Sequence, residues 1–183
     1  MSPTWTEPRR RDRGKDEAWI RAFLERAPYG VLAVGGGKGP PHVNSNLFVF
    51  DDDEAAIHVH TARVGTLASE TEEPVPATFT VFEMGRLLPA DEALEFSVEF
   101  ASVVARGLCV RMTDTGEKER CLQLLLDKYA PHLRPGRDYR PIVPAELKRT
   151  SVYRLDVEEW SGKAKSVDAD FPGAYRYGEA GDS

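Results

Sequence analysis

Two histidines that lie two positions apart are the first residues whose spacing could do chemistry. His58 and His60 fall in a segment with the alternation of a β-strand, so both imidazoles point to one face. A pair of histidines on a strand can contribute to a metal site, but such a site needs a third ligand. The third ligand could be His42, His132 or a carboxylate, but the sequence does not show that any of them lies beside the pair. We therefore expect no metal and interpret both histidines as structural or cofactor-edge residues.

The segment that begins at His60 has the chemistry of a phosphate site. It brings Arg63, the hydroxyls of Thr61 and Thr66 and the turn at Gly65 together within a few residues. A phosphate binds to a guanidinium, to hydroxyls and to free backbone N–H groups near the start of a helix. The alternative is a plain strand-to-helix turn in which Arg63 is solvated.

An antiparallel sheet must position these residues. Apolar residues at helical spacing predict helices from Glu17 to Ala27, after Asp16, and from about Glu117 to Tyr129, capped by Asp114 or Thr115. Elsewhere the period is two, which predicts strands at 31–34, 42–50, 56–61, 75–82, 98–112 and 150–157, with turns at 35–39 and 51–53. A turn followed by a helix is expected at 63–70, with Thr66 as its cap, a short helical turn at 144–147 and a bulge or bend at Gly107. This order favours a small antiparallel barrel with helices at its mouth or side.

Composition narrows the class of protein. The chain has 183 residues, of which 41% are hydrophobic and 30% charged, and no apolar run approaches the ~20 residues of a membrane span. The net charge of −6 opposes nonspecific binding to nucleic acid, and the basic residues at 9–15 are interpreted as a solvated arm. Cys109 and Cys121 have no paired spacing and are expected in the core. With no secretory signal in the sequence, we expect a cytoplasmic protein without a membrane or nucleic-acid partner.

Several segments, taken in their order and spacing, resemble the flavin-binding split-barrel proteins of the pyridoxamine 5′-phosphate oxidase-like superfamily. The opening segments are YGVLA at 29–33, GPPHVN at 39–44 and IHVHTARVG at 57–65. Later segments, at 100–107, 114–118, 146–155 and 161–163, are similar to the nitroimidazole-resistance (Nim-like) branch. The resemblance covers residues 18–165.

The resemblance implies a mainly β protein with flanking helices: an antiparallel six-stranded split barrel that forms a homodimer with FMN in the grooves between subunits. We accordingly divide the chain into a basic flexible N-terminal arm (1–15), an FMN-binding split-barrel domain (16–165) and a C-terminal tail (166–183). The positions that match the family's cofactor contacts are, for the flavin ring, Asn44, Ser45 and Asn46; for the phosphate and ribityl chain, His60, Thr61, Arg63, Gly65 and Thr66; and, near the flavin, Ser102 and Val103.

Two departures from the family pattern bear on this site. Many members have a lysine or arginine after the glycine that matches Gly65, whereas this chain has Thr66, so the phosphate would depend on Arg63 and on hydroxyls. Many members also have Val-Pro where this chain has Asn44 and Ser45, which changes the surface offered to the ring.

By resemblance, the expected function is that of an oxidoreductase that moves a hydride or electrons between FMN and a small aromatic or nitro-type substrate. No catalytic residue is assigned; His42 or His60 could donate a proton, but contact with the cofactor is the simpler role. One alternative is a flavin-binding sensor or storage protein without turnover. The other keeps the barrel but binds F420 or haem in place of FMN, with His42, His58 or His60 as a haem ligand.

Overall fold

The computed structural model describes residues 6, 8–35 and 39–179 of the chain. Its strands are β1 (Gly14–Lys15), β2 (Gly30–Val34), β3 (His42–Asn46), β4 (Phe48–Asp51), β5 (Ala56–Ala62), β6 (Val75–Leu88), β7 (Ser97–Arg111) and β8 (Thr150–Lys165). Its helices are α1 (Glu17–Arg26), α2 (Thr66–Glu70), α3 (Thr115–Tyr129) and α4 (Pro144–Leu147), with 3-10 turns η1 (Arg11–Arg13) and η2 (Ala93–Glu95).

The strands form one antiparallel sheet in the order β3-β2-β6-β7-β8-β5-β4, with β1 paired to β8. The two end strands, β3 and β4, are separated in the chain only by Leu47, so the sheet curls back on itself as a split barrel. The expected antiparallel barrel is confirmed. Its strand count is eight rather than six, because the single strand expected at 42–50 divides at Leu47 and the short β1 adds a further strand beside β8.

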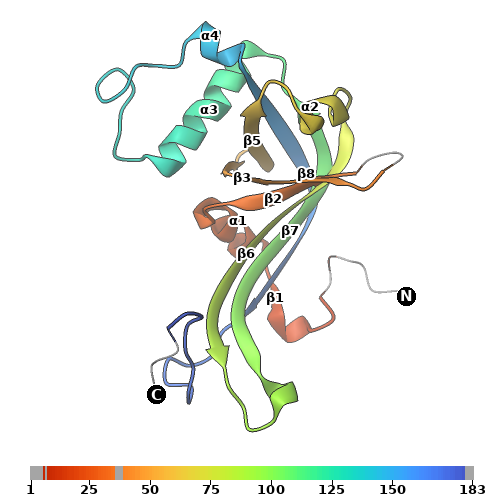
Figure 1. Ribbon diagram of the computed structural model, residues 1–183, viewed down its shortest axis with the longest axis vertical. Coiled ribbons are helices and arrows are strands. Elements are labelled where there is room, and N and C mark those ends of the chain that lie inside the picture. The colour runs from red at the N-terminus through yellow and green to blue at the C-terminus, as the bar shows by residue number, and fades with distance from the viewer. Residues whose placement is uncertain (1–5, 7, 36–38, 180–183) are drawn as a thin grey trace.

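The two long helices begin where the sequence predicts. The Asp16 carboxylate accepts a hydrogen bond from the Trp19 N–H at the start of α1, and Asp114 does the same for Glu117 at the start of α3. Thr66, by contrast, is the first residue of α2 and does not cap it; Gly65 takes that position. In Figure 1, α3 and α4 lie together at one end of the molecule, beside β5.

At the opposite end, β6 and β7 extend as a long curved arm (Figure 1). Both β6 and β8 run well beyond their predicted ends, to Leu88 and Lys165. Arg86 and Glu99 hold the C-terminal tail against this arm, since Arg86 donates to the carbonyls of residues 167–169 and Glu99 accepts from the Val167 N–H. The described part of the tail therefore lies at the far end of the barrel from α3.

The barrel encloses an apolar core. Cys109 is buried there, as the sequence predicts, and Cys121 is buried on the inner side of α3. The register between β7 and β8 shifts at the predicted position, between Arg106 and Gly107, but the extra residue is Glu158 of β8, so the bulge lies in β8 opposite Gly107 and not in β7. The turn predicted at 35–39 falls mostly on residues 36–38, outside the described residues. Among the helices described, none is long and apolar enough to cross a membrane.

Candidate cofactor site

The two histidines of β5 share one face of the strand, as expected, but they have different surroundings. His58 is fully buried, and its Nδ1 lies 3.3 Å from Cys121 Sγ on α3. Burial is the main cause that lowers the pKa of His58, to about 4, so its ring is neutral at pH 7. His60 lies two residues further on, where α3 no longer covers β5, and it is exposed to solvent.

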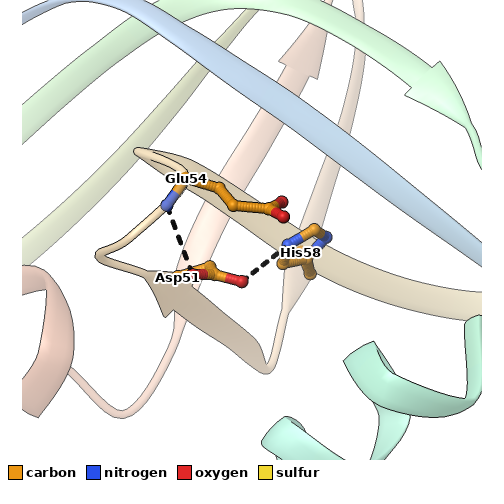
Figure 2. A group of neighbouring side chains, drawn as sticks. All are labelled: Asp51, Glu54 and His58. Atoms are coloured by element: carbon orange, nitrogen blue, oxygen red, sulfur yellow. Dashed lines mark hydrogen bonds and ion pairs between the residues drawn. The ribbon is translucent and has the colours of Figure 1, made fainter. Parts of the chain in front are cut away.

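A cluster of candidate metal ligands surrounds His58. Ligand atoms of Asp51, Glu54 and His58 lie within 4.8 Å of one another, and Figure 2 shows both carboxylates beside the ring. The Nε2 of His58 has no hydrogen-bond partner in the described part of the chain and lies 3.9 Å from Asp51 Oδ2.

Two guanidinium groups already occupy these carboxylates. Arg120 donates to Asp51 at 2.6 Å and lies 3.2 Å from Glu54, which also pairs with Arg154. Burial acts to raise the pKa of Asp51, but the hydrogen bond and charge of Arg120 outweigh it and lower the pKa. A metal ion would have to displace Arg120 from its carboxylates. We therefore interpret the cluster as an ion-pair network that fixes α3 to β4 and β5.

Beyond the end of β5 lies a basic pocket of about 270 Å³, between the start of α3 and the start of β8. Four cationic side chains line it: Arg63, Arg111, Lys118 and Lys148. Its described lining residues include no Asp or Glu. Burial, followed by the charges of Arg111 and Arg63, lowers the pKa of Lys118. Such crowding of like charges costs free energy that a bound anion would offset.

A second, apolar pocket of about 490 Å³ adjoins the basic one, because Thr150 lines both. Its walls come from Leu47, from α3, from the loop after α3 and from β5; the apolar lining residues are Leu47, Leu122, Leu125, Leu126 and Ile142, with the rings of Tyr129 and Tyr139. His60 is the one histidine among its described lining residues. Its size falls within the usual ~300–1,000 Å³ of small-molecule sites.

The structure brings only some of the predicted cofactor residues to these pockets. His60 lines the apolar pocket and Arg63 the basic one, with Gly65 and Thr66 following at the start of α2. The Thr61 hydroxyl is instead engaged within the chain, since it donates to the Ala62 carbonyl.

The three residues predicted beside the flavin ring divide between the two faces of β3. Asn44 pairs in register with Leu32, a core residue, and its side-chain amide donates to that of Asn46 at 3.2 Å. Both asparagines thus lie on the face that looks into the barrel, whereas Ser45 lies on the outer face. Ser45 is exposed there and continues toward Leu47 in the wall of the apolar pocket.

The predicted Ser102 and Val103 divide in the same way. Val103 is 1% exposed and packs in the core. Ser102 faces outward and pairs in register with Phe82, whose side chain is 57% exposed. These two residues lie on the part of the sheet from which the long β6–β7 arm extends, not beside the basic pocket.

Sequence reasoning missed three of the four cations of the basic pocket. Arg111 ends β7, Lys118 is in the first turns of α3, and Lys148 follows α4. They are distant from Arg63 in the chain and form no local motif, so only the folded arrangement of β5, α3 and β8 reveals them.

Comparisons with known proteins place this geometry in a family. The profile of the pyridoxamine 5′-phosphate oxidase family matches residues 16–164. No curated protein matches the chain.

Solved structures share the fold. The flavocytochrome Anf3 from Azotobacter vinelandii is 24% identical with a TM-score of 0.74, over 93% of this chain and 83% of that one. The FAD and heme binding protein from Mycobacterium smegmatis is 22% identical with a TM-score of 0.72, over 85% and 75%. A candidate 5-nitroimidazole antibiotic resistance protein from Bacteroides thetaiotaomicron is 18% identical with a TM-score of 0.63, over 82% and 84%. Because the family profile spans most of the barrel, as the resemblance of its segments implied, the chain belongs to the pyridoxamine 5′-phosphate oxidase family.

Proposed function

We propose that the chain is a flavin-binding oxidoreductase that uses FMN. The observation that carries this proposal is the basic pocket, where four cations meet without a lining carboxylate at the end of the strand that the family resemblance assigns to the phosphate. A phosphate carries close to two negative charges at neutral pH and accepts several charge-assisted hydrogen bonds. Relatives of the same fold include a flavocytochrome and an FAD-binding protein, which supports a flavin as the cofactor.

In this function, Arg63, Arg111 and Lys118 bind the phosphate and so fix the cofactor's position. Bound FMN supplies hydride and electron transfer, which needs few catalytic side chains from the protein. The surrounding side chains desolvate His60 and lower its pKa, so this ring is neutral at pH 7 and can accept a hydrogen bond. The substrate class we propose remains a small aromatic or nitro-type molecule.

We also propose a homodimer with the flavin at the subunit interface. The outer face of β3, β2, β6 and β7 carries small and β-branched side chains that no part of the described chain fully covers: Val31, Val43, Ser45, Thr78, Thr80 and Val104. Val43 is 57% exposed there. A sheet face of small side chains with exposed valines is a candidate for an interface, and Ser45 and Ser102 from the predicted flavin contacts lie on it.

A haem is the second cofactor we propose, bound in addition to the flavin. Two relatives with the same fold are a flavocytochrome and an FAD and heme binding protein. The feature of this chain that favours it is the apolar pocket, which is separate from the cluster of cations and has a histidine in its wall.

The first experiment is the visible absorption spectrum of the purified protein, before and after incubation with FMN and removal of unbound ligand. We expect a retained two-band flavin spectrum that bleaches when NADH or NADPH is added without oxygen. A retained flavin that no nicotinamide donor reduces would favour a sensor or storage protein instead. A protein that retains no flavin contradicts the proposed function.

A further inference from the structure

The chain has four histidines, and the structure gives them unequal access to a ligand. His58 is fully buried between Cys121 and Asp51. His42 pairs with Val34 at the other end of the β2–β3 ladder from the apolar pocket. His132 is exposed in the loop after α3 and is not among the described residues that line the pocket.

His60 is the histidine that opens into the apolar pocket. Neither of its ring nitrogens has a hydrogen-bond partner among the described residues, so a lone pair is available to a ligand in the pocket. Desolvation of the ring lowers the pKa of His60, which keeps the lone pair free of a proton at neutral pH. A neutral imidazole in an apolar wall is the usual protein ligand of a haem iron.

The distribution of polarity in this pocket suits a porphyrin better than a flavin ring. A flavin carries hydrogen-bonding atoms along its ring, which need matching donors and acceptors in the protein. Here leucines and an isoleucine form the apolar walls, and most polar lining groups are already engaged. The Tyr129 hydroxyl is engaged by the Phe48 N–H and the Pro28 carbonyl, the Tyr139 hydroxyl accepts from Gln123, and Arg140 pairs with Glu146. Thr150 lies at the border with the basic pocket. A porphyrin confines its polar groups to the central metal and one carboxylate edge.

The rim of the pocket offers a cation for that carboxylate edge. Arg140 lines the pocket and pairs with Glu146 at 2.6 Å, but both side chains are about half exposed. An exposed ion pair of this kind contributes little to stability, so exchange of Glu146 for another carboxylate costs little.

We propose that the apolar pocket binds a b-type haem, with His60 as the axial ligand of the iron and Arg140 holding a propionate. This inference rests on the second cofactor named under the proposed function and assigns its site and its ligand. It also separates the two cofactors: the basic pocket around Arg63 holds the flavin phosphate, and the haem lies beyond Thr150 against α3.

The test is a titration of the full-length protein with haemin, read from the Soret band, in the wild type and in His60→Ala, with His42→Ala as the matched control. We expect saturable binding by the wild type, and in His60→Ala a shifted Soret band and an affinity at least about tenfold lower. Added imidazole should restore the wild-type spectrum in His60→Ala. His42→Ala should bind like the wild type.

A second variant tests the pocket independently of the ligand. Leu122→Trp places a large ring in the same cavity, so it should abolish haem binding while FMN affinity, which depends on the basic pocket, stays unchanged. Retained FMN binding also shows that the variant is folded.

The outcomes separate the two proposals. Retention of FMN with no haem binding by the wild type overturns the haem proposal and leaves the flavin proposal standing. Haem binding that His60→Ala does not alter overturns the assignment of the ligand, and haem binding that survives Leu122→Trp overturns the assignment of the pocket. Failure to bind either cofactor contradicts the proposed function itself.

Discussion

At the scale of single residues, Arg63 offers the sharpest test of the phosphate site. It is the one cation of the basic pocket that the family resemblance also assigns to the phosphate, and in the described part of the chain no carboxylate pairs with its side chain. Arg63→Ala should therefore weaken FMN by ~1.5–3 kcal/mol, the scale of a hydrogen bond to a charged group. Titration of the apoprotein with FMN, followed by flavin fluorescence, measures this loss directly.

Arg137→Ala is the matched control for that substitution. Arg137 pairs with Asp138 in the exposed loop after α3 and lines neither pocket. Its removal changes the net charge by the same amount, so FMN affinity should be unchanged. Equal losses in the two variants would mean that Arg63 acts only through long-range charge, and no loss in either would move the phosphate elsewhere.

The residues of β5 also show how far a site can be predicted from the sequence. Strand alternation correctly placed His58 and His60 on one face. It could not show that Cys121 and Arg120, more than fifty residues away, would bury the first histidine and leave the second open. Local spacing determines the direction of a side chain, whereas its burial depends on helix α3, which is distant in sequence.

At the scale of elements, the close approach of Gly107 on β7 to the bulge in β8 determines how the two strands meet. An added Cβ at Gly107 would lie 1.7 Å from the backbone oxygen of Asp156, so no side chain fits without movement of one strand. We expect Gly107→Ala to lower the free energy of unfolding by at least ~3 kcal/mol, the upper part of the range for overpacked positions. The midpoint of urea denaturation, compared with the wild type, measures the change.

Gly39→Ala controls for the loss of a glycine as such, because an added Cβ there meets nothing within 4 Å. Its midpoint should stay close to that of the wild type. Equal midpoints for Gly107→Ala and the wild type would show that the two strands do not meet in this register.

An irregularity at Gly107 was predictable because a lone glycine inside a long β-pattern often marks a bulge or a close approach of another backbone. That the extra residue would lie in the partner strand β8 was not predictable, because it depends on how β7 and β8 pair. The length of the strands was not predictable either. The distal part of β6 lacks the regular apolar alternation, and Arg86 there forms an ion pair with Glu99 on β7. These two residues also hold the C-terminal tail. The contacting residues are more than sixty positions apart in the sequence, so no local pattern encodes the contact.

At the scale of the whole molecule, the proposed dimer accounts for a sheet face that the described part of a single chain leaves uncovered. Val104 lies near the middle of that face, between Thr80 on β6 and Ser161 on β8. Val104→Lys would place a charge against the partner's copy of the same surface, since a twofold interface brings one patch against itself. We expect the wild type to have the mass of two chains in light scattering, and Val104→Lys to have the mass of one.

Glu72→Lys is the control for added positive charge, because Glu72 is exposed in the turn between α2 and β6 and is not on a strand of this face. It should remain dimeric. The flavin affinity of the two variants then locates the cofactor. If the flavin ring lies between subunits, the monomeric Val104→Lys variant lacks the partner subunit and loses its affinity for FMN, although the basic pocket is intact. If monomeric Val104→Lys keeps its FMN, the basic pocket and its own subunit hold the whole cofactor, and the dimer and the flavin site are independent features of the barrel.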